Sequence, residues 1–340
     1  MSDSTLAPRR RPGLGQLIRR PEAGSLFGLM IVYVFFAIMG GENFRGAPGI
    51  SAVLNFASVV GIIALAIGLL MIAGELDLSV GAVVPASMLT LSIVANDFGF
   101  SIWGGILAAL LVGLAVGFTN GVLVLRTGIP SLIITIGTFF GVKGLLLGLT
   151  VLIHGSTGVF LVPDDVTKAL FGQMIDNRYQ VSIIWWAIFA LAIGFFLHWS
   201  PWGNGVFALG GDKDSARNAG VATNRLTIQL YMLSGFCAAS VGVLQVLTFN
   251  AGQVAAGRSF IFDSIMCVVI GGVLMTGGAG SVVGIVIGTL TFSVVNQGIF
   301  FSGLDPNFGS IIIGALLLIA VMSNDKFRAL ALGYASGKRK

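Results

Sequence analysis

The chain has 340 residues, of which 56% are apolar and only 10% are charged, whereas an average soluble domain is about 25% charged. This contrast excludes most soluble folds, and the density of Leu, Ile, Val and Phe excludes a disordered linker. The 49 glycines follow no Gly-X-Y period, which excludes collagen. The composition therefore predicts an all-α polytopic membrane protein. The net charge of +5 then reflects loop residues that set membrane orientation rather than a nucleic-acid surface.

Ten apolar segments predict about ten transmembrane helices. The first, residues 24–41, follows an arginine-bearing segment and has no small-x-small cleavage site, so we expect a retained helix rather than a secretory signal. The other segments cover residues 52–73, 80–95, 101–125, 130–152, 181–199, 227–249, 262–275, 282–302 and 309–322. The two shortest, 80–95 and 262–275, are candidates for broken or re-entrant segments.

The Lys and Arg residues indicate how these spans are oriented. With a cytoplasmic N-terminus, 14 of the 19 basic residues fall on the cytoplasmic side, as the positive-inside rule requires. These residues are Arg9, Arg10, Arg11, Arg19, Arg20, Arg126, Lys213, Arg217, Arg225, Lys326, Arg328, Lys338, Arg339 and Lys340. The opposite side keeps Arg45, Lys168, Arg178 and Arg258, while Lys143 falls inside a span. We therefore expect both termini in the cytoplasm.

This topology predicts one transmembrane domain over residues 24–322, between cytoplasmic tails at 1–23 and 323–340. An outer loop covers 153–180, and a cytoplasmic loop covers 200–226. In the outer loop, Asp164 or Asp165 can cap a short helix with an apolar stripe. The stripe consists of Val166, Ala169, Leu170 and Met174.

Two similar patterns lie about half a chain apart. Glycines recur every fourth residue at Gly113, Gly117 and Gly121, and again at Gly280, Gly284 and Gly288. Asn120 and Asn296, which are 176 residues apart, are each followed by a proline ten residues later, Pro130 and Pro306. An offset of five spans gives the halves opposite topology, which predicts two inverted half-repeats with a substrate path between them. Alternatively, the glycines only permit close helix packing.

Charged residues interrupt the spans at two places. Glu75 and Asp77 lie in the segment from Gly74 to Gly81, and two carboxylates there must reach the cytoplasmic interface or line a polar cavity. Either this is a solvated turn in which Asp77 or Ser79 caps the next helix, or it belongs to a pathway. Lys143 needs a carboxylate partner, a water-filled cavity or snorkelling to an interface.

The cytoplasmic loop contains a short predicted helix, with Asp212 as its N-cap and Gly220 at its end. About two turns are marginal alone in water, so this helix needs a surface to dock on. Ser215, Ala216 and Ala219 would let it fit a cleft on a partner, with Arg217 as a charged anchor. The alternative is docking onto the chain's own membrane face.

The sequence contains no pattern typical of an enzyme. It has no Gly-x-x-x-x-Gly-Lys-Ser/Thr loop, no Gly-x-Ser-x-Gly elbow and no His-Glu-x-x-His site. Cys237 and Cys267 lie in apolar runs and are expected to be small core residues. His154 and His198 lack metal-ligand spacing. We therefore expect no ATP hydrolysis, cofactor or metal site in this chain.

Several motifs together resemble those of sugar-type ATP-binding-cassette (ABC) importer permeases, the ribose permease family. The stretch Gly74-Glu-Leu-Asp-Leu-Ser-Val-Gly81 is similar to that family's Gly-Gly-Ile-Asp-Leu-Ser-Val-Gly. The segments 120–126 and 129–138, the glycines at 271–272 and 277–280, and Asn296-Gln-Gly298 also match in order. Residues 208–220 resemble the family's Ala-x-Gly-Gly-Asn-x-x-Ala-Ala-Arg-x-x-Gly segment. The departures are Glu75, Asp212 for Asn, and Ser215 for Ala.

The resemblance implies a permease dimer, two cytoplasmic ATPase subunits that bind ATP and Mg, and an extracytoplasmic sugar-binding protein. It also implies that the loop helix is the coupling helix that seats in the ATPase. The residues expected in this coupling are Gly210, Gly211, Asp212, Ser215, Ala216, Arg217, Ala219 and Gly220.

The sequence thus predicts the permease subunit of a bacterial ABC importer in the cytoplasmic membrane, for a ribose-, xylose-, galactose- or fructose-like monosaccharide or a small polyol. Neutral sugars need hydrogen-bonding and aromatic side chains. The pathway candidates of that type, with the polar break, are Asn55, Glu75, Asp77, Ser79, Asn120, Ser131, Thr135, Thr138, Asn296 and Gln297. The alternative is a secondary transporter in which Glu75, Asp77, Lys143 or Asp263 binds a coupling ion. A membrane enzyme comes third.

Overall fold

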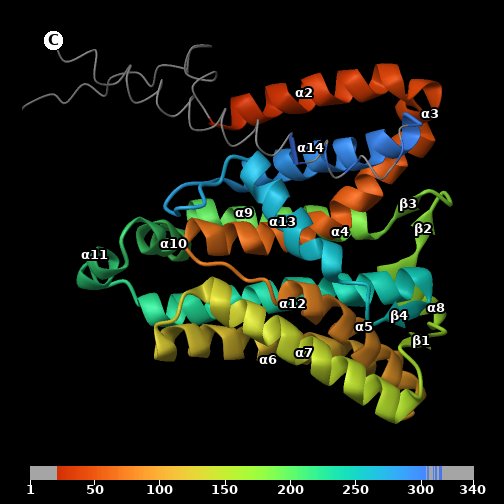
Figure 1. Ribbon diagram of the computed structural model, residues 1–340, viewed down its shortest axis with the longest axis horizontal. Coiled ribbons are helices and arrows are strands. Elements are labelled where there is room, and N and C mark those ends of the chain that lie inside the picture. Colours follow the sequence, from red (N-terminus) through yellow and green to blue (C-terminus); the bar gives the residue numbers. More distant parts are fainter. Residues whose placement is uncertain (1–20, 304, 306–308, 310, 312–313, 316–340) are drawn as a thin grey trace, which may run out of the picture.

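The computed structural model describes residues 21–303 and, beyond them, residues 305, 309, 311, 314 and 315. Helices make up most of this part (Figure 1). The long helices are α2 (Pro21–Met39), α4 (Ala47–Ile72), α5 (Val80–Asn96), α6 (Ile102–Thr127), α7 (Ser131–His154), α9 (Ser182–Trp199), α12 (Thr223–Phe249), α13 (Arg258–Ile270) and α14 (Val282–Phe301). Six of these, α4, α6, α7, α9, α12 and α14, are long and apolar enough to cross a membrane.

Short elements connect the long helices. They are α3 (Gly41–Arg45), β1 (Gly158–Phe160), α8 (Asp165–Thr167), the π-helical turn η1 (Lys168–Gly172), β2 (Met174–Ile175), β3 (Tyr179–Gln180), α10 (Pro201–Gly211), α11 (Lys213–Asn218) and β4 (Ala251–Gln253). β1 pairs antiparallel with β4, and β2 pairs antiparallel with β3. The four strands gather at one end of the molecule and α11 projects from the other (Figure 1). We call these ends the strand end and the α11 end.

The helix termini follow local rules of capping. The α6 helix begins after Ser101, whose hydroxyl accepts a hydrogen bond from Gly104 N at 3.2 Å. It ends at Gly128, whose φ of +66° lies in the left-handed region that favours glycine. Pro130 then immediately precedes α7, where its fixed φ and missing N–H are tolerated.

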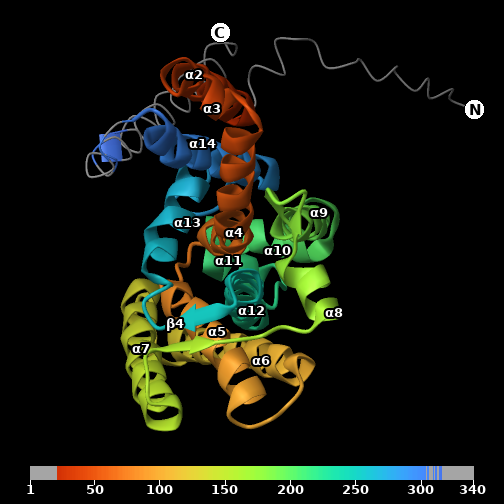
Figure 2. The same cartoon turned by 90° about the vertical axis from the view of Figure 1, so that its right-hand side faces the viewer.

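The core lies around α4, α5 and α12, which occupy the middle of the molecule (Figure 2). In the most apolar 18-residue stretch of α4, 83% of the residues are buried, whereas in the corresponding stretch of α7 only 11% are buried. Of the 17 residues of α5, 13 are buried, and Pro85 does not interrupt the helix. The segment 80–95, a candidate for a broken or re-entrant span, therefore forms one continuous helix without a break.

The first nine apolar segments all correspond to helices. The tenth, 309–322, and the tails 1–23 and 323–340 lie almost entirely outside the described residues. In the outer loop, Asp164 caps α8 as predicted, since its carboxylate accepts a hydrogen bond from Thr167 N at 2.8 Å. The predicted apolar stripe is wrong, because Met174 lies in β2 and Leu170 is exposed. Gly172 instead packs against the backbone of Leu247 in α12.

Glycines bring helix backbones into contact at both predicted ridges. A Cβ on Gly113 of α6 would lie 2.3 Å from the carbonyl oxygen of Gly235 in α12. A Cβ on Gly288 of α14 would lie 2.1 Å from the carbonyl oxygen of Cys267 in α13. The packing role of these glycines is confirmed, but the two ridges meet different helices. Both cysteines are free and buried, as expected for small core residues.

Helix bounds recur at a constant spacing along the chain. Shifted by 176 residues, the bounds of α4, α5 and α6 become 223–248, 256–272 and 278–303, close to those of α12, α13 and α14. Contacts recur too, since α5 and α6 pack on α12 while α13 and α14 pack on α4. The same shift carries Gly113 to Thr289 and Gly117 to Ser293, so the two glycine ridges are not equivalent positions in this pattern.

Candidate functional site

A buried polar cluster lies at the break between α4 and α5. Asp77 is 2% exposed. Its Oδ1 accepts hydrogen bonds from Ser79 N at 2.9 Å and Ser79 Oγ at 2.6 Å. Its Oδ2 accepts one from Ser234 Oγ of α12 at 2.8 Å. Asp77 thus holds the turn that starts α5 and ties this turn to α12. A turn that precedes the next helix was predicted, but this one is buried rather than solvated.

Asn120 of α6 joins the same cluster. Its Nδ2 donates to Ser79 Oγ at 2.8 Å and lies 3.4 Å from Asp77 Oδ1. Its Oδ1 is buried and finds no hydrogen-bond partner among the described residues. Buried acceptors of this kind normally bind a partner such as water. The cluster therefore has one acceptor available for a further hydrogen-bond donor.

Glu75 and Leu76 extend the network to α7 and α12. Tyr231 OH donates to Glu75 Oε2 at 3.3 Å and lies 3.2 Å from the carbonyl oxygen of Leu76. The backbone N–H of Leu76 donates to Ser131 Oγ at 3.1 Å. The structure thus brings five of the sequence candidates together around the break, Glu75, Asp77, Ser79, Asn120 and Ser131.

The other pathway candidates lie elsewhere. Asn55 binds the β2–β3 hairpin, because its Nδ2 donates to the carbonyl oxygen of Arg178 at 2.7 Å and its Oδ1 accepts from Gln180 N at 2.9 Å. Thr135 and Thr138 donate to carbonyl oxygens of their own helix. Asn296 and Gln297 in α14 bond to each other at 3.1 Å. These candidates make no hydrogen bond to the cluster.

Tyr231 and Ser234 were not among the sequence candidates. Both lie in α12, three residues apart, and therefore on one face of the helix. The sequence signal that could have identified them is a polar pair three residues apart in an apolar segment. Sequence alone does not show which neighbour that face meets.

At the α11 end of the molecule, the short helix α11 has the predicted cap. Asp212 Oδ1 accepts a hydrogen bond from Ser215 N at 2.7 Å. Hydrogen bonds from Ser215 hold the pKa of the Asp212 carboxyl below its usual value. Gly220, with a φ of +86°, follows the end of the helix. A helix of six residues was thus correctly located from the Asp212 and Gly220 signals.

The residues of α11 divide between two faces. Ser215, Arg217 and Ala219 are exposed, whereas Ala216 is buried at 4% exposure. Ala216 therefore packs against its own chain. It is not free to enter a partner's cleft, which differs from the sequence prediction for this residue. Arg217 reaches Asn224 Oδ1 at 3.4 Å. Arg217 is thus an exposed residue of the helix that projects from the α11 end (Figure 1).

Gly210, at the end of α10, is wedged between two breaks in the helices. A Cβ there would lie 1.7 Å from the carbonyl oxygen of Ile72 and 2.7 Å from Gly278 N. Gly278 N donates to that same Ile72 oxygen at 2.8 Å. Gly74, which follows α4, has a φ of +81° and is in contact range of Gly210. Gly211, by contrast, has nothing within 4 Å of a Cβ. We call this contact of Gly210, Ile72 and Gly278 the Gly210 junction.

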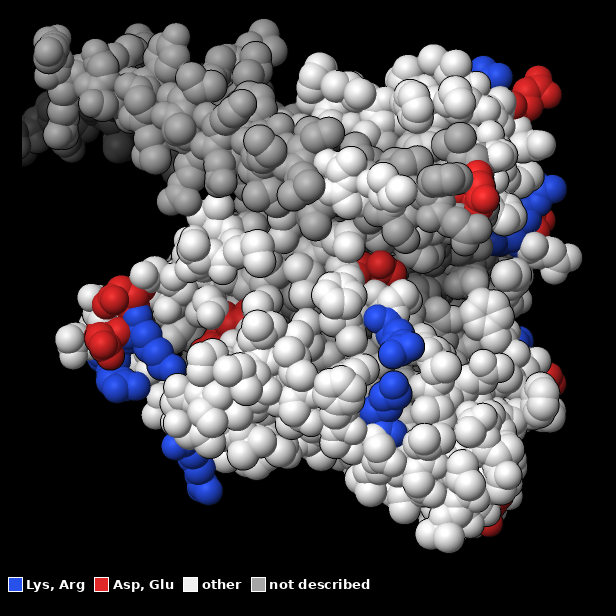
Figure 3. Space-filling model, viewed as in Figure 1, with Lys and Arg blue, Asp and Glu red and all other residues white. Residues whose placement is uncertain are grey.

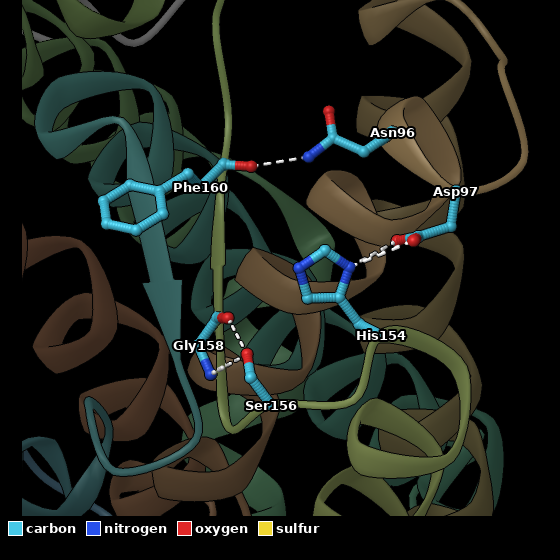
Figure 4. A network of polar contacts seen from close by, with 6 residues as sticks. All are labelled: Asn96, Asp97, His154, Ser156, Gly158 and Phe160. Atoms are coloured by element: carbon cyan, nitrogen blue, oxygen red, sulfur yellow. Dashed lines mark hydrogen bonds and ion pairs between the residues drawn. The ribbon is translucent and has the colours of Figure 1, made fainter.

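At the strand end, polar contacts tie α5 to α7 and β1 (Figure 4). His154 Nδ1 lies 3.0 Å from Asp97 Oδ1, and Asn96 Nδ2 donates to the carbonyl oxygen of Phe160 at 2.5 Å. The Ser156 hydroxyl donates to the Gly158 carbonyl oxygen. His154 thus has a structural partner. Among the described residues, no three His, Cys, Asp or Glu side chains gather as a metal site would require.

Comparison with known proteins identifies the family. A family profile described as the permease component of the branched-chain amino acid transport system matches residues 49–321. The chain belongs to this permease family. The match includes the polar cluster, the Gly210 junction and α11. The chain is therefore a membrane-embedded, multi-pass permease component, which is a transport subunit rather than an enzyme in itself.

Three relatives match over most of their length. The fructose import permease FrcC of Rhizobium meliloti is 28% identical over 92% of this chain and 87% of its own. The ribose import permease RbsC of Escherichia coli K12 is 28% identical over 90% and 94%. The inner membrane ABC transporter permease YjfF of the same strain is 32% identical over 86% and 88%. The resemblance to the ribose permease family that the motifs indicated is confirmed.

Proposed function

We propose that this permease is the membrane subunit of an ABC importer that carries a monosaccharide or small polyol across the bacterial cytoplasmic membrane. The observation that carries the proposal is the family match over residues 49–321, which contains a capped helix projecting from one end. Import permeases for fructose, ribose and autoinducer 2 are among the relatives. The ATPase subunit binds ATP and Mg, and an extracytoplasmic binding protein delivers the solute.

The α11 end is the proposed cytoplasmic end, where the exposed face of α11 meets the ATPase. Movement of α11 reaches the membrane domain through the Gly210 junction, since a backbone contact this close leaves no room for independent movement. The Gly210 junction contacts Ile72 and Gly74, and this segment leads directly into the Asp77 cluster. ATP-driven displacement of α11 therefore acts on both helix breaks at once, which is a route to alternating access.

The recurrence of helix bounds at 176 residues supports two inverted half-repeats. In the proposed topology α4, α5 and α6 cross the membrane in the opposite sense to α12, α13 and α14. The two triplets make corresponding contacts with each other, as a pseudo-two-fold arrangement requires. The ten-span topology with both termini in the cytoplasm stays part of this proposal.

A second copy of the chain is the proposed partner within the membrane. In the most apolar stretch of α7, only 11% of the residues are buried. The exposed residues of α7 include large apolar side chains such as Phe140, Leu145 and Leu152. Helix surfaces of this kind face either lipid or another subunit. In the proposed dimer, part of this face of α7 contacts the second copy, and lipid covers what remains.

An ion-coupled secondary transporter remains the alternative, and the geometry of Asp77 favours it less. Three hydrogen bonds from Ser79 and Ser234 already satisfy the Asp77 carboxylate. These bonds fix the start of α5, so the residue has a structural task. Asp263, another candidate for a coupling ion, belongs to no group of three His, Cys, Asp or Glu side chains that could hold a metal ion within the described part of the chain.

Uptake into proteoliposomes distinguishes the two functions. The permease is reconstituted with its ATPase and binding protein, and radiolabelled sugars are supplied with ATP inside or outside the vesicles. We expect uptake only when ATP is hydrolysed on the α11 side, and no change when a protonophore collapses the proton gradient. Uptake that continues without ATP hydrolysis and stops with the protonophore would overturn the ABC importer.

A further inference from the structure

A cavity of about 450 Å³ opens between α5, α7, the β1–β4 ribbon and α13. Lys143 of α7 and Arg258 of α13 both line it. Phe139, Thr157 and Gln253 add an aromatic ring and two polar side chains, and the rest of the lining is mostly apolar. Figure 3 shows two Lys or Arg groups next to each other between the positions of α13 and α7, with an acidic group above them on the same face.

Backbone packing places Arg258 beside the cavity, and Lys143 reaches it from α7. A Cβ on Gly257 would lie 1.9 Å from the carbonyl oxygen of Gly81. The start of α13 is therefore pressed onto α5, and Arg258, the next residue, is held beside the cavity. Lys143 lies near the middle of α7, with its Nζ 5.8 Å from the centroid of the Phe139 ring. Two cations from separate helices thus share one cavity.

Neither cation has a negative partner in the described part of the chain. The ion pair found there joins His154 to Asp97, and neither Lys143 nor Arg258 donates a hydrogen bond to a described residue. Lys143 falls inside a span, where a cation normally pairs with an acid or lines a hydrated path, whereas Arg258 is exposed at the start of α13. Two cations in one cavity repel each other, and a bound anion would relieve that repulsion.

We propose that this cavity is a binding site for the carboxylate of an acidic sugar or polyol, so that the solute class of the importer is a sugar acid rather than a neutral sugar. The inference rests on the proposed transport function. Lys143 and Arg258 hold the carboxylate, while Gln253 and Thr157 offer hydrogen bonds to hydroxyl groups. The Phe139 ring offers an apolar face to the carbon chain. The volume suits a small ligand, since ligand pockets are typically about 300–1,000 Å³.

The phosphate of an anionic lipid carries the same kind of charge, so the test separates the two sources. The full-length permease is placed in nanodiscs of phosphatidylcholine alone or with phosphatidylglycerol, without ATPase. Binding of radiolabelled D-gluconate is compared with binding of D-glucitol, which has the same carbon skeleton and no carboxylate. The variants are Lys143→Gln, Arg258→Gln and, as a conservative change, Lys143→Arg. Arg178→Gln removes an exposed cation from the strand end but outside the cavity, and is the matched control.

We expect gluconate to bind at least tenfold more tightly than glucitol in phosphatidylcholine. Each glutamine variant in the cavity should weaken gluconate binding about tenfold, while Lys143→Arg and Arg178→Gln keep it. Equal binding of the two probes, or binding unaffected by both cavity variants, overturns the inference. Retention of phosphatidylglycerol that depends on both cations, without gluconate binding, assigns the site to lipid and also overturns it. ATP-driven uptake of a neutral sugar alone would refute the sugar acid while the importer function stands.

Discussion

The Asp77 carboxylate joins parts of the chain that are 157 residues apart, because it accepts hydrogen bonds from Ser79 and from Ser234. A charged acceptor in a buried site is stabilised only while its donors remain in place. The start of α5 and the middle of α12 are therefore coupled through a single side chain. Asn120 adds the same coupling to α6.

Ser234→Ala removes one of these charge-assisted bonds without changing the helix. We expect a loss of about 1.5–3 kcal/mol of stability, the usual range for a hydrogen bond to a charged group. Ser240→Ala is the matched control, because Ser240 lies on the same helix and donates only to the carbonyl oxygen of Phe236. Its effect should stay within about 0.5 kcal/mol. Thermal unfolding of both purified variants in detergent measures the difference, and equal losses would contradict the role of Ser234.

Sequence reasoning found only part of this cluster. Glu75 and Asp77 were detectable because charges are rare in apolar segments, and Asn120 and Ser131 because of the motifs. Ser234 was not, since a serine in a membrane helix usually bonds its own backbone, as Ser240 does. Which residues of α12 face the break depends on the rotation of α12 about its axis. That rotation is set by the contact of Gly235 with Gly113, which no local pattern shows.

Among the elements, α10 connects α11 to the membrane domain at one glycine. Gly210→Ala would place a Cβ against two backbone atoms that belong to different helix breaks. Overpacking of this kind costs about 1–3 kcal/mol, and here it separates the surfaces of the Gly210 junction. We expect ATP-driven uptake to fall at least tenfold, while the ATPase still copurifies. Gly211→Ala, one residue later in open space, is the control and should retain uptake. Equal activity of the two variants would show that the junction does not transmit movement.

The cap of α11 makes a prediction about binding of the ATPase at neutral pH. Because hydrogen bonds lower the pKa of Asp212 in the folded protein, the cap contributes stability above the ordinary carboxyl pKa. This contribution is lost only as the pH falls through the lowered folded value. Asp212→Asn keeps the cap without titrating, whereas Asp212→Ala removes it. We expect binding of the ATPase, measured by surface plasmon resonance at neutral pH, to weaken several-fold in Asp212→Ala and to be unchanged in Asp212→Asn. Weakening of both variants alike would mean that the charge contacts the ATPase directly.

The exposed side of α11 makes a separate prediction. Arg217 is exposed and its neighbour Ala216 is buried, so a change of charge at Arg217 affects the surface without disturbing the seat of the helix. We expect Arg217→Glu to reduce copurification of the ATPase at least fivefold while membrane insertion stays intact. Arg126→Glu, at an exposed position in the last turn of α6, serves as the control. Unchanged association would remove Arg217 from the proposed interface.

Elements were easier to predict than their orientation. Long apolar runs determine helices because no other spanning structure satisfies the backbone in lipid, so nine segments became helices. The Asp212 and Gly220 signals located α11, but not which of its faces points inward. A helix of six residues has too little surface to decide its own orientation. The sequence therefore predicts that Ala216 contacts a partner, whereas in the structure its own chain covers it. The helix α10 was missed altogether, since residues 201–211 contain four glycines and only modest apolar patterning.

For the whole molecule, the two ends and the two buried cysteines allow a direct test of orientation. Cys237 and Cys267 are fully buried, so a membrane-impermeant maleimide should give almost no background. Ser215→Cys places an exposed thiol on α11, and Gln173→Cys places one at the strand end. In the proposed topology these positions face opposite sides of the membrane, with α11 in the cytoplasm. We expect Ser215→Cys to be labelled only in inside-out vesicles and Gln173→Cys only in intact spheroplasts. Labelling of both positions from one side would rule out the span count between them, because α9 alone separates the two loops. The reversed pattern would instead invert the permease and remove α11 from the reach of a cytoplasmic ATPase.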